Sequence, residues 1–319
     1  MEQLTELIAR EDIDQLSQSE GLSFDDDRIA ILESMQSIDV QACPGSGKTT
    51  LIAAKLMLLA KKWPLSGQGI CVLSHTNVAK DEIIERLKQS KTPEAQELLS
   101  YPHFIGTIQE FVGKFLAFPC LRSNQIDINH VDTDACVDLI ASKISPATKA
   151  YVDRKSQFSN VLYDFDLKYE DGVLSFNVPT FNGESTSNSY KDLKSVRTEL
   201  IKNGHLFYRD VFTFARIALA KNTNLSSIVQ KRFPFVFIDE MQDTQKFQDE
   251  LLQQTFPLGN ESVTVQRFGD PDQAIFHGIG NEESNESFNG KQVDDMDFVV
   301  NKSHRFDANL AAKIKPLSI

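Results

Sequence analysis

Residues 41–50 read QACPGSGKTT, a glycine-rich segment that lies between an apolar run, SIDVQA, and a helical pattern, TTLIAAKLMLLAKKW. A strand, a glycine-rich turn and a helix N-terminus in this order form an anion site, because backbone N–H groups and the helix dipole converge on one point. Gly45 and Gly47 allow the backbone conformations and the close approach that such a turn requires. The segment therefore predicts a strand, a phosphate loop and a helix.

The residues after the second glycine indicate which anion the loop binds. Lys48 can reach the β- and γ-phosphates of a nucleoside triphosphate, and the Thr49 hydroxyl can ligate Mg²⁺. The usual pattern has glycine at its first position, where this chain has Ala42. The alternative is a glycine-rich turn that binds nothing, and the Gly-Lys-Thr run at the start of a helix argues against it. The predicted nucleotide-binding residues of the loop are Ala42, Cys43, Pro44, Gly45, Ser46, Gly47, Lys48, Thr49 and Thr50.

Apolar strands alternate with helices on both sides of the middle of the chain. Such alternation indicates βαβ units, and strands that read as continuous apolar runs are typical of a parallel sheet buried on both faces. We therefore predict an α/β fold of the P-loop NTPase type, with a parallel sheet flanked by helices. The predicted strands are 37–42, 69–75, 103–108, 233–240, 263–270 and 297–305, and the predicted helices are 49–63, 77–89, 109–118 and 246–256.

Residues 121–204 differ in character from the stretches around them. VLYDFDLKYEDGVLSFNVP alternates with period two around an Asp-Gly pair, which predicts a β-hairpin, and the polar FNGESTSNSY that follows predicts a loop. We interpret this part as a small inserted subdomain. The predicted organisation is an N-terminal helical extension over 1–24, one sheet domain built from 25–120 and 205–319, and the insertion over 121–204.

Composition narrows the class of protein. Hydrophobic residues make up 41% and charged residues 24%, and no run reaches the roughly 18 apolar residues of a membrane span. The N-terminus lacks the pattern of a signal peptide, so we expect a cytoplasmic protein without a membrane partner. The four cysteines form no CxxC pair, which argues against a zinc cluster or a disulfide framework. A net charge of -12 argues against a broad basic surface but not against one narrow nucleic-acid groove.

The strand FVFIDE ends in two acids, Asp239 and Glu240. Ligands of open α/β sheets bind at the carboxyl ends of strands, so both acids are expected beside the phosphate loop. Hydrolysis needs a metal anchor and a group that orients the attacking water. We predict that Asp239 holds Mg²⁺, directly or through a water molecule, and that Glu240 orients or deprotonates the attacking water. The alternative is a pair of acids that are merely solvated at a strand end.

Several segments together resemble the superfamily 1 DNA helicases of the UvrD/Rep/PcrA type. The resemblance covers about 25–119 and 205–319, and five ordered segments after a phosphate loop are more specific than any one alone. These segments are SHTNVAKDEIIERL at 74–87, GTIQEF at 106–111, IDEMQDT at 238–244, GDPDQAIF at 269–276 and SHRF at 303–306.

The resemblance implies a RecA-like motor domain that binds ATP and Mg²⁺, with 121–204 in the place of the family's inserted domain. It also implies that Gln273 senses the γ-phosphate and that Arg305 contacts it as an arginine finger. Both roles are chemically sensible, because an amide can hydrogen-bond a phosphate oxygen and a guanidinium offsets developing charge. Arg28 occupies the position at which the family places a glutamine that reads adenine, and we expect it to bind the nucleotide there by stacking on the base. Without the resemblance, Gln273 and Arg305 would be interpreted as surface residues.

The resemblance further implies a single-stranded DNA partner. Thr76, Asn77 and Thr107 match family positions, and their short polar side chains suit phosphate contacts that position a strand without reading its sequence. Gln109 and Phe276 stand where the family has a histidine and a tyrosine, and they complete the predicted DNA-binding set. Ordinary strand-end and helix-cap chemistry is the alternative for the polar residues.

Our leading interpretation is the ATPase half of a UvrD-like helicase. Nothing after Arg305 resembles the family's second RecA-like half, so we expect this chain alone to bind ATP, to hydrolyse it poorly and not to translocate. Family context suggests a nuclease or another protein subunit as a partner, as in bacterial anti-phage systems. The competing interpretation is a nucleotide-dependent switch or scaffold that regulates such a partner. A small-molecule kinase would explain Asp239 but would leave the segments at 74, 106 and 269 as coincidence.

Overall fold

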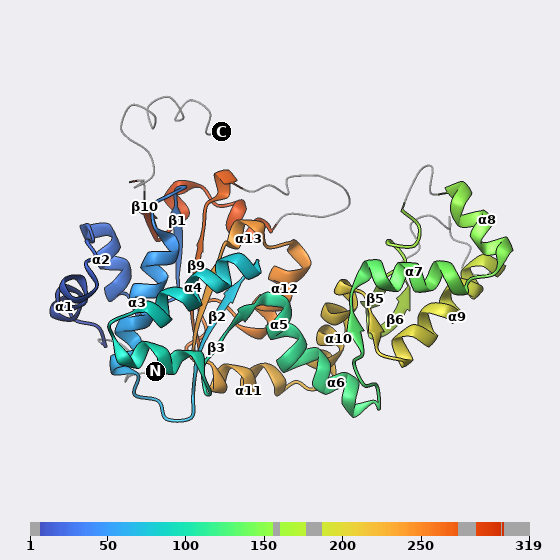
Figure 1. Ribbon diagram of the computed structural model, residues 1–319, viewed down its shortest axis with the longest axis horizontal. Coiled ribbons are helices and arrows are strands. Elements are labelled where there is room, and N and C mark those ends of the chain that lie inside the picture. Colours follow the sequence, from blue (N-terminus) through green and yellow to red (C-terminus); the bar gives the residue numbers. More distant parts are fainter. Residues whose placement is uncertain (1–6, 156–159, 177–186, 274–284, 301, 303–319) are drawn as a thin grey trace. The chain divides into compact units, whose positions relative to one another are not determined.

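The computed structural model describes residues 7–155, 160–176, 187–273, 285–300 and 302 (Figure 1). The chain forms two compact units, of which the first combines Met1–Ile108 with Ser226–Ile319 and the second is Gln109–Leu225. In the described part of the chain, no helix combines the length and the apolar character needed to cross a membrane.

The first unit is built on a six-stranded sheet whose strand order is β10-β1-β9-β8-β2-β3. Every neighbouring pair in it is parallel, so the predicted parallel sheet is confirmed. The sheet draws its strands from both ends of the chain, as the interrupted pattern predicts. Its strands are β1 (Ile38–Ala42), β2 (Ile70–Ser74), β3 (Phe104–Thr107), β8 (Phe235–Asp239), β9 (Thr264–Gly269) and β10 (Phe298–Val300).

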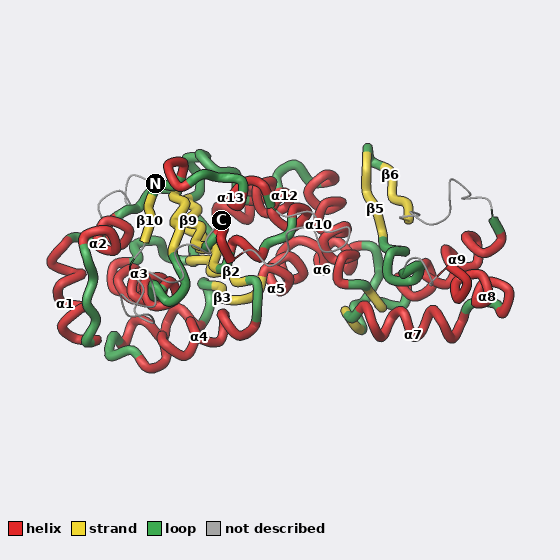
Figure 2. The backbone as a smooth tube through the Cα atoms, turned by 90° about the horizontal axis from the view of Figure 1, so that it is seen from above, coloured by secondary structure: helices red, strands yellow, loops and turns green. Residues whose placement is uncertain are grey.

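Helices cover the two faces of this sheet. The connections from β1 to β2 and from β2 to β3 move along the sheet toward the β3 edge, whereas those from β8 to β9 and from β9 to β10 move toward the β10 edge. Crossovers between parallel strands are right-handed, so opposite directions place the connecting helices on opposite faces. Accordingly, α3 and α4 lie on one side and α12 and α13 on the other (Figure 2). The helices of this unit are α1 (Arg10–Glu20), α2 (Asp26–Glu33), α3 (Lys48–Lys62), α4 (Asn77–Gln89), η2 (Pro93–Leu99), α11 (Leu225–Arg232), η4 (Met241–Asp243), α12 (Lys246–Thr255), η5 (Pro271–Gln273), α13 (Glu286–Asn289) and η6 (Val293–Asp295).

Burial explains why these segments form strands. Every residue of β2, β8 and β9 is buried, and in β2 and β8 this matches the continuous apolar runs of the sequence. β9 also buries the polar side chains of Gln266 and Arg267. The main core joins the apolar residues of β1, β2 and β8 to the inner faces of α1, α2, α3 and α4. Lys55 of α3 also lies in this core and donates hydrogen bonds to the carbonyl oxygens of Ile31 and Ser34 at the end of α2. Burial holds the pKa of Lys55 well below its usual value.

A buried ion pair joins β1 to β9. Asp39 and Arg267 face each other in the strand register, and the guanidinium contacts both carboxylate oxygens at 2.6 and 2.5 Å. Lys291 contacts the same carboxylate at 2.5 Å. Burial by itself would raise the pKa of Asp39, but these two cations hold it below its ordinary value. The pair fixes the register of β1, the strand that carries the phosphate loop.

The second unit is mostly helical and contains the predicted hairpin. β5 (Leu167–Glu170) and β6 (Val173–Phe176) are antiparallel, and the hairpin is confirmed. Asp171 and Gly172 take φ values of 50° and 80°, the left-handed conformations that a two-residue hairpin turn requires. The other elements are α5 (Ile108–Val112), the π-helical turn η3 (Gly113–Ala117), α6 (Phe118–Ser123), β4 (His130–Val131), α7 (Thr133–Lys143), α8 (Pro146–Lys155), α9 (Asn188–Lys202), β7 (His205–Leu206) and α10 (Tyr208–Lys221).

The second unit extends beyond the predicted insertion, 121–204, at both ends. Its boundaries lie at Gln109 and Leu225 because α10 packs against η3 and α6, so these flanking helices belong to the same compact unit. The predicted loop over 181–190 is wrong at its end, since α9 begins at Asn188. The Ser187 side chain caps this helix by accepting a hydrogen bond from the backbone N–H of Tyr190, and the ring of Tyr190 is buried.

Candidate nucleotide site

The phosphate loop runs from the end of β1 to the start of α3. Gly45 and Gly47 take φ values of 71° and 84°, so both use the left-handed conformations that favour glycine. The backbone N–H of Ser46 donates to the carbonyl oxygen of Cys43 at 3.0 Å, which closes the turn. α3 begins at Lys48, so the free N–H groups of its first turn face the loop.

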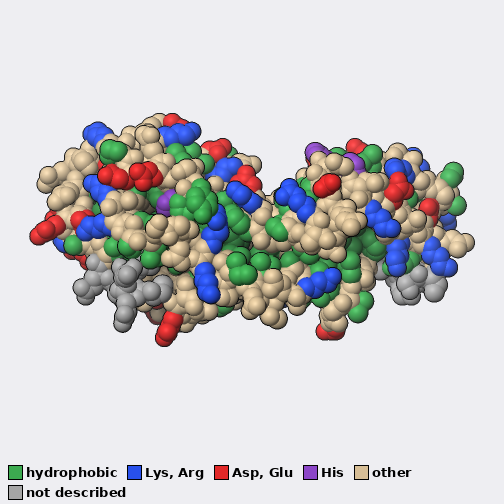
Figure 3. Space-filling model, turned by 90° about the horizontal axis from the view of Figure 1, so that it is seen from below, with side chains coloured by type: hydrophobic (Ala, Val, Ile, Leu, Met, Phe, Trp, Pro, Cys, Tyr) green, Lys and Arg blue, Asp and Glu red, His purple; other side chains and the backbone are tan. Residues whose placement is uncertain are grey.

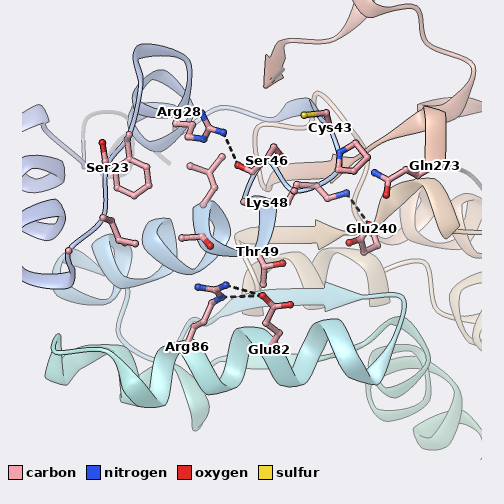
Figure 4. A pocket seen from close by; sticks show the side chains of 18 residues that line it. Ser23, Arg28, Cys43, Ser46, Lys48, Thr49, Glu82, Arg86, Glu240 and Gln273 are labelled. Atoms are coloured by element: carbon pink, nitrogen blue, oxygen red, sulfur yellow. Dashed lines mark hydrogen bonds and ion pairs between the residues drawn. The ribbon is translucent and has the colours of Figure 1, made fainter. Parts of the chain in front are cut away.

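A pocket of about 540 Å³ opens over this loop (Figure 4). The acidic end of β8, the η5 turn, α4 and the chain between α1 and α2 complete its wall. Ala42 is not part of the wall, because it is the last residue of β1 and only 1% exposed. The lining residues are Gly21, Leu22, Ser23, Phe24, Arg28, Cys43, Pro44, Gly45, Ser46, Gly47, Lys48, Thr49, Thr50, Leu51, Glu82, Arg86, Glu240 and Gln273.

Lys48 and Glu240 form an ion pair inside the pocket. The Lys48 ammonium lies 3.1 Å from the Glu240 carboxylate, although the two residues are far apart in sequence (Figure 4). Their side chains are 9% and 27% exposed, so the pair is partly shielded from water. Glu240 takes a φ of 53°, a left-handed conformation that is costly for a residue with a side chain. This conformation turns the chain out of β8.

Asp239, the last residue of β8 and the neighbour of Glu240 in sequence, is fully buried. One carboxylate oxygen accepts a hydrogen bond from the backbone N–H of Glu240 at 2.9 Å, and the other has no hydrogen-bond partner among the described residues. Burial, followed by the negative charge of Glu240, raises the pKa of Asp239 to about 7. Asp239 is not among the residues that line the pocket, but Glu240, the next residue, is. Buried polar atoms nearly always have a partner, so the unpartnered oxygen of Asp239 has the chemistry of a cation ligand. The buried hydroxyl of Ser46 likewise has no partner in the described part of the chain.

Three polar residues connect Glu240 to the end of β9. Gln242 donates to the Glu240 carboxylate at 2.5 Å, and its amide oxygen accepts from the backbone N–H of Asp270 at 3.0 Å. Gln273 donates to the Asp270 carboxylate at 2.6 Å and also lines the pocket. The structure thus brings the predicted residues Lys48, Glu240 and Gln273 to one cavity.

Arg28 is held in the wall of the pocket by three hydrogen bonds. Its guanidinium donates to Asp25 at 2.6 Å, to the loop carbonyl oxygen of Ser46 at 2.7 Å and to the carbonyl oxygen of Lys302 at 2.9 Å. Arg28 is only 4% exposed, so most of its side chain contacts protein. It braces the phosphate loop from outside, a role that the sequence did not predict.

The predicted DNA-binding residues lie at the carboxyl ends of β2 and β3 and beyond them. Thr76 and Asn77 are exposed at the N-terminus of α4, where the Thr76 hydroxyl caps the helix by accepting from Ala79. Thr107 pairs with Ser74 in the sheet register. Gln109 lies in α5 and belongs to the second unit. Phe276 and Arg305, two further predicted site residues, lie outside the described residues.

Sequence reasoning missed several residues of the site. Gln242 lay within the quoted run IDEMQDT, but its partner Asp270 is 28 positions away, and no local pattern joins them. Glu82 and Arg86 line the pocket from α4 as an i,i+4 pair with an N···O distance of 3.0 Å. The predicted helix over 77–89 placed both on one face, which was the available signal.

Comparison with known proteins identifies the family of this chain. A model of the UvrD/REP helicase N-terminal domain family matches residues 25–283. The chain belongs to this family. The match contains the phosphate loop, the Asp239–Glu240 strand end and Gln273, so the family accounts for the whole described pocket wall from Arg28 onward.

Individual relatives agree with this membership. The chain is 24% identical to a probable DNA helicase II homolog of Mycoplasma capricolum, over 86% of this chain and 38% of that protein. It is 26% identical to the ATP-dependent DNA helicase srs2 of Schizosaccharomyces pombe, over 84% of this chain and 32% of that protein. DNA helicase II of Haemophilus influenzae is 21% identical over 74% of this chain and 32% of its own length. The chain thus spans about a third of the length of the curated relatives that it matches.

Proposed function

We propose that this chain binds ATP with Mg²⁺ and hydrolyses it as the N-terminal ATPase domain of a UvrD-like DNA helicase. The observation that supports this most is the buried Asp239 oxygen, which lacks a partner among the described residues and lies next to the Lys48–Glu240 pair. A buried carboxylate oxygen without a partner is uncommon in proteins, and it has the chemistry of a metal ligand. The names of the relatives, which include an ATP-dependent DNA helicase, point the same way.

The donor set suits Mg²⁺. Asp239 offers a carboxylate oxygen and Thr49, which lines the pocket, offers a hydroxyl, both of which are hard oxygen ligands. No three His, Cys, Asp or Glu side chains gather as a metal site in the described ranges, so the ion would keep water and phosphate oxygens as further ligands. When bound, Mg²⁺ supplies positive charge that offsets the phosphates.

Lys48 and Glu240 exchange partners in the proposed reaction. In the structure the Lys48 ammonium contacts the Glu240 carboxylate, and the phosphates of a bound nucleotide are the better partner for that ammonium. Glu240 then orients the attacking water and accepts its proton. Gln273 and Arg305 contact the γ-phosphate in this scheme, and Arg28 holds the phosphate loop in shape through Ser46.

Single-stranded DNA is the proposed partner of the ATPase. Thr76 and Asn77 are exposed at a helix N-terminus, which favours phosphate contacts. Thr107, Gln109 and Phe276 complete the proposed contacts. Lys and Arg side chains are interspersed with Asp and Glu on the face shown in Figure 3, which favours a narrow contact with DNA over a broad basic one.

The test is the ATPase rate with and without single-stranded DNA. We expect DNA to stimulate turnover by about tenfold or more, because coupling requires that DNA binding change the catalytic rate. An unchanged rate would instead support a nucleotide-dependent switch that regulates a partner protein such as a nuclease. A chain that binds no ATP would contradict both functions.

A further inference from the structure

Gln242 lies between the two acidic turns of the pocket and is nearly fully buried, with 4% of its surface exposed. Its amide nitrogen donates to the Glu240 carboxylate at 2.5 Å and its amide oxygen accepts from the backbone N–H of Asp270 at 3.0 Å. One side chain therefore connects the end of β8 to the end of β9.

The amide makes both contacts at once because it carries a donor and an acceptor on the same group. A carboxylate at this position would place a second negative charge against Glu240, and an apolar side chain would make neither hydrogen bond. Among the described residues, the Glu240 oxygen that faces Gln242 has two partners, the Lys48 ammonium and this amide. If phosphates draw Lys48 away, Gln242 is the partner that keeps the carboxylate in place.

The surroundings of Gln242 fit its amide closely. A Cβ added to Gly269, the last residue of β9, would lie 2.7 Å from the Gln242 amide oxygen and 2.6 Å from the Phe288 ring. Only glycine at this position leaves room for both. The backbone carbonyl oxygen of Gln242 accepts a hydrogen bond from the Asn289 side chain at 3.0 Å. The η4 turn that contains Gln242 is therefore also bonded to α13.

A second asparagine fixes the same turn. Asn285 is fully buried, and its amide nitrogen donates to the carbonyl oxygens of Met241 at 2.7 Å and Thr244 at 3.1 Å. The backbone around Gln242 is therefore anchored on both sides. This rigidity suits a residue whose side chain must hold another in one orientation.

We propose that Gln242 is a positioning residue, which orients the Glu240 carboxylate for its water and ties it to the Asp270–Gln273 turn. The inference rests on the proposed ATPase function, because it assigns Gln242 a task within that reaction. Gln242 acts through Glu240 and does not itself contact the nucleotide.

The test replaces Gln242 with leucine, which is similar in size but makes no hydrogen bond. We expect kcat to fall by about 10- to 100-fold, as for other residues that orient a catalytic group, while the Kd for ADP changes by less than about threefold. Aluminium fluoride bound with ADP mimics the transferring phosphate. The Kd for this combination should rise by about the same factor as kcat falls. Gly269→Ala, which pushes the amide aside without removing it, should reproduce this pattern in part.

A double-mutant cycle separates positioning from general damage. If Gln242 acts through Glu240, the Glu240→Gln and Gln242→Leu changes together should lower kcat no more than Glu240→Gln alone. The assignment would be overturned if the two changes lowered kcat by the product of their separate factors. It would also be overturned if Gln242→Leu left kcat unchanged, or if it raised the ADP Kd by the same factor as it lowered kcat. A wild-type chain without turnover would overturn the proposed function and this inference with it. If Gln242→Leu fails to fold, Gly269→Ala supplies the same comparison.

Discussion

Lys48 and Glu240 have different roles in the proposed reaction: Lys48 binds the phosphates, and Glu240 activates the water. Lys48→Ala removes the cation that would face the phosphates. We therefore expect ATP affinity to fall by at least about 100-fold, or about 2.8 kcal/mol, near the upper end of what one charged hydrogen bond contributes. Glu240→Gln keeps the shape of the side chain but removes the base, so binding should persist while kcat falls by roughly 100-fold or more. Titration with a fluorescent ATP analogue and a phosphate-release assay measure the two effects. Normal turnover in Glu240→Gln would contradict the assigned role of Glu240.

The proposed metal-binding role of Asp239 carries a cost in stability. Its buried carboxylate has one oxygen without a partner among the described residues, and its pKa is raised to about 7. We expect Asp239→Asn to stabilise the metal-free protein by about 1–3 kcal/mol at a pH well above neutrality, because a buried charge is removed. The same change should abolish turnover. Thermal unfolding in a chelator measures the first effect, and an unchanged or lower Tm would contradict it.

The elements of the sheet depend on ion pairs that no strand pattern reveals. Arg267→Met leaves the Asp39 carboxylate buried with Lys291 as its remaining cation among the described residues. We expect a loss of about 3–5 kcal/mol in the free energy of unfolding, which urea denaturation measures. The matched control is Asp39→Leu together with Arg267→Met, which removes both charges. The pair is a determinant of stability only if this double variant recovers much of the loss.

The first residue of β2, Ile70, makes a pH-sensitive contact. The backbone N–H of Ile70 donates to the Nδ1 atom of His103 at 3.0 Å, which requires a neutral ring, and burial lowers the pKa of His103. A lowered folded pKa means that this contribution is complete above the unfolded value of about 6.5 and is lost as pH falls toward the folded value. His103→Phe should be less stable than wild type above pH ~6.5, and its stability should change less between neutral and mildly acidic pH. Parallel stability profiles for the two proteins would contradict this expectation.

At the scale of elements, the sequence predicted the sheet better than the helices of the second unit. Strands β2 and β8, which are fully buried, appear as continuous apolar runs, and all six strands overlap their predicted ranges. The segments 188–202 and 208–221 were not predicted as helices, because amphipathic helices of an inserted unit carry no neighbouring motif to frame them. The contact between Gln242 and the backbone of Asp270 shows the same limit within the site. A sequence identifies polar residues, but only the fold shows which of them meet.

On the scale of the whole molecule, each compact unit contains its own buried ion pair. In the second unit, Arg197 and Asp210 lie 2.6 Å apart with both side chains fully buried, and the guanidinium stacks 3.6 Å from the centre of the Phe207 ring. We expect Arg197→Met to destabilise this unit by about 3–5 kcal/mol, because it strands a buried carboxylate. ATP affinity should change by less than about twofold, since the pocket lies wholly in the first unit. Calorimetry and ATP titration of the same variant test both statements, and a matching loss of ATP binding would contradict the second.

The order of strands in the sheet has a consequence for synthesis on the ribosome. β1 and β2 are neighbours in sequence, but β9 and β8 lie between them in the sheet. A nascent chain that has emerged only as far as residue 225 therefore has β1 without either of its partners, and β2 with β3 alone. The unpaired edges of β1 and β2 remain exposed until residues 235–300 have been synthesised. Before β8 has been synthesised, the acidic strand end cannot lie beside the phosphate loop. The two halves of the proposed nucleotide site, the phosphate loop after β1 and the acidic end of β8, therefore come together only after residue 240 has been synthesised.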